Sequence, residues 1–460
     1  MKLSEIQMTL TQIQVSPVKT MGQNFLHDQN LARWIVSRAE LTSEDLVVEV
    51  GPGLGALTEF ALAAGARVLA IEKDARLAQF LRERFNSELL DVVHADALDF
   101  DVRQLFAFPR VKFIANLPYN ISSQVLLRFT QYPSPISLWL CMLQKEMARR
   151  LSAEPGSSDY GALTVLVQSR YRVEYLRTVA ASVFLPQPEV DSAFVKLVPR
   201  AADELPDFDS ELFKRLVRLG FSQRRKQLQK LLRAEVADWP AAANTCAFEL
   251  KARAEELSLR QWIALANFAG PAEVVSAQSG TEEWFAVVDE NDLVIGKAPR
   301  GKVHGDNSRH RAVHILIFNA KGELFLQKRS RWKDRHPGVW DSSAAGHVDA
   351  GEEYHEAAAR ELQEELGITA RLARVAKLSA SARTGEEFIW IYRGEHEGPF
   401  QLARSEIELG GFFDTELVSR WLQARSDDFA PGFAECWKVF REREATAAGA
   451  EAPPASARRD

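Results

Sequence analysis

The chain of 460 residues contains two glycine-containing motifs that lie far apart in the sequence. Each motif needs its own surrounding strands and helices to hold its loop in place. The first is Glu-Val-Gly-Pro-Gly-Leu-Gly at residues 49–55, directly after a β-rich run. The second occupies residues 346–368, where a glycine-rich loop leads into a run of glutamates. One hydrophobic core rarely supports a chain of this length, so we expect two or three domains.

The pattern between residues 31 and 199 alternates short β-rich runs with helical stretches such as residues 75–85. Such alternation predicts a parallel α/β sheet with helices on both faces. From about residue 209 to 268 the pattern is helical only, which predicts a small helical appendage. The β-rich runs are residues 46–50, 67–71, 111–115, 138–143 and 194–198.

The composition of two segments marks the domain boundaries. Residues 270–281 have the Gly, Pro, Ser and Gln content of a linker, and a new β-rich pattern begins at Trp284. The last residues lack periodicity, so we expect a disordered tail. The predicted parts are a first domain (1–200), a helical subdomain (201–269), a linker (270–281), a second domain (282–444) and a tail (445–460).

Nothing in the sequence predicts a membrane span or export. No run approaches eighteen apolar residues, and the N-terminus lacks the charged start and apolar centre of a signal peptide. The three cysteines, Cys141, Cys246 and Cys436, do not have the spacing of metal ligands. We expect a cytoplasmic protein with free thiols and no membrane partner. The sequence does not fix the oligomeric state, and a monomer is our working expectation.

The net charge of −6 is unevenly distributed. Residues 1–270 contain 32 Lys and Arg against 31 Asp and Glu, whereas residues 271–460 contain 25 against 32. Residues 214–233 hold eight basic residues and no acidic one. A solvated helix face is the simpler explanation, but a run without acids favours binding to a phosphate backbone.

The first motif predicts a cofactor site. A strand that ends in Gly51, Gly53 and Gly55 lets the backbone approach a nucleotide-like group. About twenty residues later, Glu72 ends the next predicted strand, where a carboxylate can accept both hydrogen bonds of a ribose diol. NAD and S-adenosylmethionine both present that diol, so these residues alone leave both cofactors open.

The sequence Asn116-Leu117-Pro118-Tyr119 favours methyl transfer to an amine. The lone pair of an aromatic amine is delocalised, and acceptance of its N–H groups by the Asn116 side-chain oxygen and a backbone carbonyl favours the pyramidal nitrogen needed for attack. Pro118 fixes the turn, and Tyr119 can stack on a base. S-adenosylmethionine is therefore the expected cofactor.

Together with four further segments, these residues resemble the ribosomal RNA adenine dimethyltransferases of the KsgA type, over about residues 18–268. The four segments are 22–26, 96–97, 183–193 and 221–228. The resemblance implies a Rossmann-like methyltransferase followed by a small helical domain that helps to hold RNA. The residues it implies for S-adenosylmethionine binding are Asn24, Leu26, Gly51, Gly53, Gly55, Glu72, Asp96 and Asn116.

The resemblance also implies a target. Two adjacent adenines near the 3′ end of 16S rRNA, in the 30S subunit, would each receive two methyl groups at N6. Tyr119 and Phe184 would sandwich an extruded adenine, as chemistry on a structured RNA requires. Without the resemblance, Phe184 could equally be a core aromatic. The implied RNA-binding residues are Arg224, Arg225, Lys226 and Lys230.

The second motif predicts divalent-metal chemistry on a diphosphate. Glu361, Glu364 and Glu365 lie three and four positions apart on a predicted helix, so their oxygens can converge on Mg²⁺ or Mn²⁺. Glu352 is expected to pair with Arg360 and brace the preceding loop. Residues 282–440 resemble the Nudix hydrolases, which implies an α/β/α sandwich and hydrolysis of a small nucleoside diphosphate derivative.

Two alternatives remain at this point. The first half can be a resistance-type methyltransferase that acts on large-subunit rRNA, or a non-catalytic assembly factor of the small subunit with a Nudix docking module. Residues 190–193 and 221–228 fit the small-subunit branch better. The complete Asn-Leu-Pro-Tyr turn opposes a pure binding protein, since such a protein does not need to orient an amine.

Overall fold

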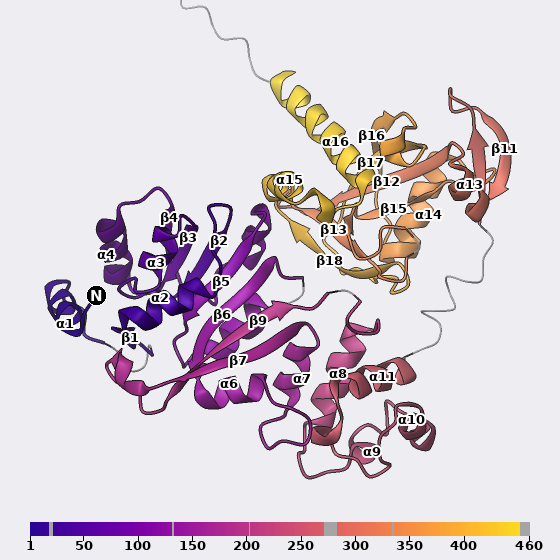
Figure 1. Ribbon diagram of the computed structural model, residues 1–460. Helices are drawn as coiled ribbons and strands as arrows, with labels where there is room; N and C mark the ends of the chain where they lie inside the picture. Colours follow the sequence, from indigo (N-terminus) through magenta and orange to yellow (C-terminus); the bar gives the residue numbers. More distant parts are fainter. Residues whose placement is uncertain (18–21, 131–132, 202, 271–282, 334, 451–460) are drawn as a thin grey trace, which may run out of the picture. The chain divides into compact units, whose positions relative to one another are not determined.

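A computed structural model describes residues 1–450 except 18–21, 131–132, 202, 271–282 and 334 (Figure 1). The chain forms two compact units, Met1–Pro271 and Ala272–Asp460. Most of the predicted linker lies outside the described residues. Among the residues described, no helix combines the length and the apolar character needed to cross a bilayer.

The first unit is built on a seven-stranded sheet with the order β4-β3-β2-β5-β6-β9-β7. Strands β4, β3, β2, β5 and β6 run parallel, whereas β9 is antiparallel to both of its neighbours. The strands are β2 (Leu46–Val50), β3 (Arg67–Glu72), β4 (Leu90–His94), β5 (Val111–Asn116), β6 (Ile136–Gln144), β7 (Tyr171–Val179) and β9 (Ser192–Pro199).

The prediction of a parallel sheet is therefore right for four of the five predicted β-rich runs, β2, β3, β5 and β6, and wrong for β9. A parallel return needs a crossover of a dozen or more residues, usually with a helix. The connection from β7 to β9 contains only the short η3 (Ala181–Val183) and β8 (Phe184–Leu185). Without a crossover helix, β9 returns antiparallel.

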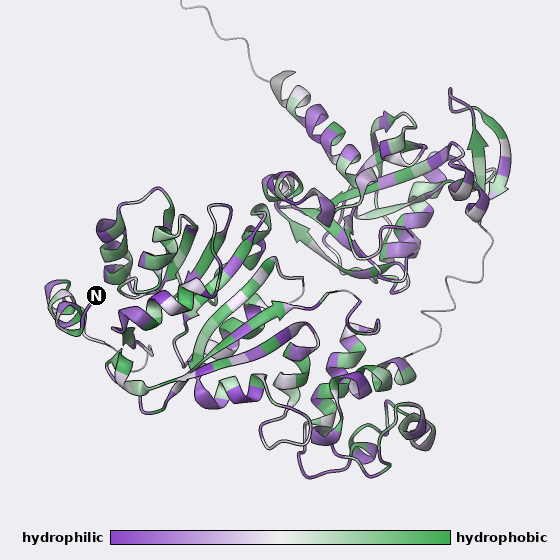
Figure 2. Cartoon of the chain, in the orientation of Figure 1, coloured by the Kyte–Doolittle hydropathy of each residue, from purple (hydrophilic) through white to green (hydrophobic). Residues whose placement is uncertain are grey.

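Helices cover both faces of this sheet, which confirms the Rossmann-like α/β architecture. Along β2, Val47 belongs to the apolar cluster that contains α2, α3 and α4, and Val48 to the cluster that contains α5, α6 and α7. Figure 2 shows the resulting hydrophobic strands between amphipathic helices. The helices are α2 (Gln29–Ser37), α3 (Thr58–Ala63), α4 (Ala75–Phe85), α5 (Ser122–Phe129), α6 (Lys145–Leu151) and α7 (Ala162–Gln168).

A two-stranded sheet closes one end of this unit. Strand β1 (Phe25–Leu26) pairs with β8, so that Phe25 lies opposite Leu185. The N-terminal helix α1 (Leu3–Gln12) packs Ile6 and Leu10 against Phe25. This pairing brings residues 22–26 next to the loop that precedes β9.

The predicted helical appendage follows β9 and has a hydrophobic core of its own, centred on the fully buried Trp262. This core also includes Val165 of α7, so the appendage is packed onto the sheet domain. The appendage comprises α8 (Ser210–Gly220), α9 (Leu228–Leu231), α10 (Trp239–Thr245), η4 (Ala254–Glu256) and α11 (Leu259–Ala269).

The second unit contains the hairpin β10–β11 and a seven-stranded mixed sheet ordered β14-β13-β12-β17-β16, with β15 on β12 and β18 on β13. Strands β12 and β17 are parallel. The strands are β10 (Trp284–Val288), β11 (Val294–Pro299), β12 (His310–Phe318), β13 (Leu324–Arg329), β14 (Trp340–Asp341), β15 (Ala344–His347), β16 (Ala373–Leu378), β17 (Glu387–Glu395) and β18 (Ile407–Phe413).

Helices on both sides of this sheet confirm the predicted α/β/α sandwich. On β12, Val313 and Ile315 pack against α14, whereas Phe318 stacks on Phe440 of α16. The helices are α13 (Arg300–Asp306), α14 (Tyr354–Leu366), η5 (Ala382–Thr384), α15 (Thr415–Ala424), η6 (Ser426–Asp428) and α16 (Pro431–Ala450).

The predicted disordered tail begins within a helix. Helix α16 continues to Ala450, so its last six residues, 445–450, belong to the predicted tail. The segment lacks an amphipathic pattern, but four of its six residues are alanines, whose high helix propensity continues a helix already anchored by Phe433 and Trp437. Residues 451–460 lie outside the described residues.

Candidate active sites

A cavity of the first unit lies at the carboxyl ends of β2, β3 and β5, where α/β sheets bind their ligands. Seven of the predicted cofactor residues line it, from segments spread over more than ninety positions. Gly55 does not line the cavity. The seven are Asn24, Leu26, Gly51, Gly53, Glu72, Asp96 and Asn116.

The turn after β2 depends on its glycines. Gly51, Gly53 and Gly55 have φ values of +66°, +57° and +78°, which side chains rarely tolerate. Gly55 also lies against Phe85, where a side chain would collide with the ring. The role of Gly55 is thus close packing between this turn and α4.

Glu72 lies at the floor of the cavity and is 5% exposed. Its carboxylate accepts backbone hydrogen bonds from Gly53 (3.1 Å) and Asp74 (2.9 Å). Burial outweighs these bonds and raises the pKa of Glu72. Asp96, at the other side, accepts from the Leu98 backbone (2.9 Å) and from Lys73 Nζ (2.6 Å). These contacts hold both carboxylates at the cavity wall.

Asn116 ends β5 at the rim of the cavity. Its Nδ2 donates to the backbone carbonyl of Asn24 at 2.9 Å. This hydrogen bond fixes the orientation of the amide, whose oxygen is the group that can accept from a ligand. Pro118 also lines the cavity, and its ring would crowd a side chain at Gly51, whereas Leu117 is 1% exposed and belongs to the core.

The two predicted stacking aromatics lie in different environments. Tyr119 is partly exposed, and its hydroxyl is hydrogen-bonded to the buried Ser192. Phe184 is 3% exposed, packs in the core cluster of α2 and does not line the cavity. Neither ring lines the cavity, and Tyr119 differs from Phe184 in being partly exposed.

Glu49 gives a prediction about pH and stability. It is 3% exposed, and Thr58 Oγ1 donates to it at 2.6 Å. Burial, with the charge of Glu72, raises its pKa to about 8. Because the folded state holds this proton more tightly than the unfolded state, the stabilisation exists below about pH 4.5 and is lost as the pH rises toward 8.

The substitution Glu49→Gln mimics the protonated acid. We expect the melting temperature of this variant to rise relative to that of the wild type as the pH increases from 5 to 8. The gain should reach at least about 1 kcal/mol, or about 2–4 °C. Calorimetry in the absence of cofactor measures this difference in melting temperature. The unfolding transition of the first unit is identified as the one that S-adenosylmethionine shifts in a separate scan. The exposed Glu88→Gln is the control, and a gain that is constant over this pH range would contradict the account.

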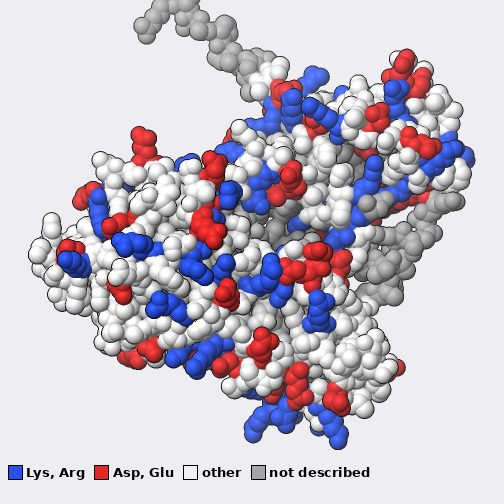
Figure 3. Space-filling model, viewed as in Figure 1, with Lys and Arg blue, Asp and Glu red and all other residues white. Residues whose placement is uncertain are grey.

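The four predicted RNA-binding residues, Arg224, Arg225, Lys226 and Lys230, are all exposed in the helical appendage. Arg224 donates to the backbone carbonyl of Ser158. The neighbouring Lys214 and Arg215, in contrast, pair with glutamates. On the face shown in Figure 3, Lys and Arg are interspersed with Asp and Glu. The basic run is thus partly neutralised on α8 and strongest at residues 224–230.

The three Nudix-motif glutamates lie on α14. Glu365 is 3% exposed and accepts from Gln327 Nε2 (3.0 Å) and the Ala345 backbone (3.1 Å). Glu361 fills the space that a side chain on Gly346 would need. The side chain of Glu364 is 59% exposed. Burial and the charge of Glu365 raise the pKa of Glu361. Such a crowded carboxylate set fits a divalent cation that would neutralise it.

Arg360 braces this site. It binds Glu352 through two hydrogen bonds of 2.9 and 3.0 Å, which confirms the predicted pair. It also contacts Glu361 (2.7 Å), Glu364 (3.1 Å) and the carbonyl of His347 (3.0 Å). One guanidinium therefore ties the loop to the helix, with hydrogen bonds in several directions.

Sequence reasoning missed the cationic lining of the adjacent cavity, which has a volume of about 330 Å³. Four arginines from separate segments meet there with four histidines and two carboxylates. Their irregular spacing leaves no signal in the sequence. Guanidinium groups bind phosphate oxygens well, so this lining suits an anionic ligand. The arginines are Arg300, Arg329, Arg335 and Arg383.

Comparisons with known proteins find a matching family model for each of the two units. The profile described as ribosomal RNA adenine dimethylase matches residues 17–270, and the profile described as NUDIX domain matches residues 308–432. The ribosomal RNA small subunit methyltransferase A of Prosthecochloris aestuarii is 41% identical over 260 residues, which cover 56% of this chain and 96% of that protein.

The protein of the same name from Chlorobium phaeobacteroides is 40% identical over 263 residues, 57% of this chain and 97% of that protein. The solved dimethyladenosine transferase of Plasmodium falciparum is 25% identical and covers 52% of this chain and 95% of its own, with a TM-score of 0.45. The chain belongs to the ribosomal RNA adenine dimethylase family and carries a NUDIX domain in its second unit.

Proposed function

We propose that the first unit transfers methyl groups from S-adenosylmethionine to the N6 amines of two adjacent adenines near the 3′ end of 16S rRNA. The observation that carries this proposal is the position of Asn116. Its amide is fixed by Asn24 at the rim of the cavity that contains Glu72. The names of the small-subunit relatives support the choice of target.

The cavity suits the cofactor. Glu72 would accept from the ribose diol, Asp96 from the adenine amine, and the backbone at Gly51 and Gly53 leaves room for close approach. The bound cofactor supplies an electrophilic methyl group on sulfonium. Asn24 and Leu26 come from β1 and the turn before it, so the β1–β8 pairing helps to position the cavity wall.

The protein residues orient the target amine. The Asn116 oxygen would accept one N–H of the adenine amine and a backbone carbonyl of the 116–119 turn the other, which directs the nitrogen lone pair at the methyl group. Tyr119, braced by Ser192, would stack on the extruded base. The attacking amine becomes acidic only after transfer, so water can take its proton.

The helical subdomain, residues 201–269, would hold RNA through residues 224–230. We expect the double substitution Arg225→Gln and Lys226→Gln to weaken binding to small-subunit rRNA at low salt. The slope of log affinity against log salt should fall by about 2, one for each lost phosphate contact. Filter binding at several salt concentrations measures it.

The matched control is Lys297→Gln with Lys321→Gln, which removes two exposed charges from the second unit. Methyl transfer at saturating RNA should be unaffected in both proteins. If the slope of log affinity against log salt is unchanged in the variant of Arg225 and Lys226, these two residues do not contact the RNA.

The direct test of the target is transfer of labelled methyl groups from S-adenosylmethionine to ribosomal subunits. We expect incorporation into small subunits that lack the 3′-terminal methylations, and none into methylated small subunits or large subunits. Incorporation into large subunits would indicate the resistance-type reaction. No incorporation, with RNA binding intact, would indicate an assembly factor.

We further propose that the second unit hydrolyses a small nucleoside diphosphate derivative. Glu361, Glu364 and Glu365 would hold Mg²⁺ or Mn²⁺, which supplies charge neutralisation and an activated water. Arg360 holds the motif in shape, and the arginine-lined cavity would bind the diphosphate. We place both activities in the cytoplasm, on a monomeric chain with a linker at residues 270–281.

A further inference from the structure

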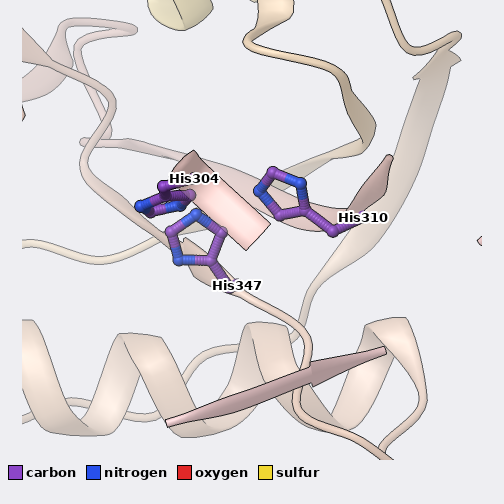
Figure 4. Close-up of side chains that lie close together, drawn as sticks. All are labelled: His304, His310 and His347. Carbon is purple, nitrogen blue, oxygen red and sulfur yellow. The ribbon is translucent and has the colours of Figure 1, made fainter. Parts of the chain in front are cut away.

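Three histidines of the second unit gather beside the arginine-lined cavity (Figure 4). His304 comes from α13, His310 begins β12 and His347 ends β15. Their ring nitrogens lie within 4.8 Å of one another. A fourth residue, Glu387 at the start of β17, places Oε1 at 3.5 Å from His310 Nε2 and 3.4 Å from His347 Nε2. Four elements thus direct three imidazoles and one carboxylate at one point.

Two of these nitrogens are buried without a hydrogen-bond partner among the described residues: Nε2 of His304 and Nε2 of His310. Buried polar atoms normally have partners, because an unpaired one costs about 1–3 kcal/mol. Two such atoms in one cluster therefore indicate a missing ligand common to both.

A hydrogen bond to the backbone fixes the tautomer of His310. Its Nδ1 lies 2.8 Å from the carbonyl oxygen of Ser308. A carbonyl only accepts, so Nδ1 carries the hydrogen and Nε2 of the neutral ring presents its lone pair to the cluster. This arrangement is typical of metal-binding histidines, whose second nitrogen donates to a carbonyl or carboxylate.

The distances favour a shared ion over hydrogen bonds. A charge-assisted N–H···O contact measures about 2.7–2.9 Å. The contacts of Glu387 Oε1 with the two histidines are longer, 3.4 and 3.5 Å. Ligands at about 2.0–2.1 Å from a tetrahedral metal lie about 3.3–3.4 Å apart, close to the observed spacing.

The cluster is rigid and accessible. The ring of Phe285, 1% exposed, stacks on His347 (4.3 Å, 25°) and on His310 (5.7 Å, 7°). His304, His347 and Glu387 also line the cavity, which provides an entry path.

We propose that His304, His310, His347 and Glu387 bind one divalent transition-metal ion, in a centre separate from the Nudix-motif glutamates. Three nitrogens and one oxygen suit Zn²⁺, Mn²⁺ or Co²⁺ better than Mg²⁺, which prefers oxygen ligands. The three Nudix-motif glutamates offer oxygen only. The inference does not depend on which diphosphate the domain hydrolyses.

Titration of the untagged full-length chain with Co²⁺ tests this proposal, with visible absorption as the readout. We expect d–d bands that saturate at one ion per chain and that added Zn²⁺ abolishes. The bands should persist in Glu361→Gln with Glu365→Gln. They should disappear in His304→Gln and in Glu387→Gln, with affinity lower by at least about 100-fold.

The exposed His355→Gln is the matched control and should keep wild-type bands. Far-UV circular dichroism checks each fold, and His304 is the first choice because it lies on a short peripheral helix and is only partly buried. Co²⁺ should also raise the melting temperature of the wild type and not of His304→Gln. Bands that survive in both cluster variants, or that disappear in the glutamate variant alone, would overturn the proposal.

Discussion

Asn116→Ala should reduce methyl transfer by about 10²–10³-fold while leaving rRNA affinity near the wild-type value. The expected loss corresponds to removal of one preorganised transition-state hydrogen bond. The Asn116 amide is held by Asn24, so it is oriented before the target arrives. Single-turnover transfer of labelled methyl groups gives the rate, and filter binding gives the affinity.

The exposed Asn30→Ala is the matched control for this substitution and should behave as wild type. Asn116 also lines the cofactor cavity, so binding of S-adenosylmethionine must be measured by calorimetry in parallel. A fall in RNA affinity as large as the fall in rate would show that Asn116 acts in binding and not in orientation of the amine.

Glu365→Gln should remove metal-dependent pyrophosphate hydrolysis, by about 10³-fold or more, without an effect on methylation. The substitution keeps the shape of the side chain but removes a charge that a divalent cation requires. The buried Glu365 is fixed by Gln327 and the Ala345 backbone, so it is preorganised. Phosphate release from a panel of nucleoside diphosphate derivatives with Mg²⁺ or Mn²⁺ measures the loss.

Glu290→Gln, an exposed glutamate of the same unit, is the control. Methyl transfer by Glu365→Gln should equal that of the wild type, because the two centres belong to separate units. Reduced methylation in a correctly folded Glu365→Gln protein would demonstrate coupling that we do not expect. Full hydrolysis would exclude Glu365 as a metal ligand.

Much of the fold could be predicted because its signals are local. Strands such as β2 and β5 are buried on both faces and therefore appear in the sequence as apolar runs that only one charged residue each, Glu49 and Lys112, interrupts. The direction of β9 could not be predicted in the same way, since it depends on the connection from β7 and not on the residues of the strand. The end of α16 was also missed, because helix propensity continued the helix past its amphipathic pattern.

The same distinction between local signals and tertiary structure applies to the residues of the candidate sites. Cofactor residues that follow strand ends, such as Glu72 and Asn116, share one cavity because parallel strands end at one edge. Phe184 belongs to segment 183–193, which resembles the methyltransferase family, but its ring packs in the hydrophobic core. The histidine cluster has irregular spacing, and only the tertiary fold assembles it.

The most direct test of the central claim is mass spectrometry of the 3′-terminal fragment of 16S rRNA after reaction of unmethylated small subunits with the full-length protein and S-adenosylmethionine. We predict dimethylation of two adjacent adenines in that fragment, strongly reduced at the same reaction time with Asn116→Ala and retained with Glu365→Gln. An unmodified fragment, or methyl groups found only on other nucleotides, would contradict the account.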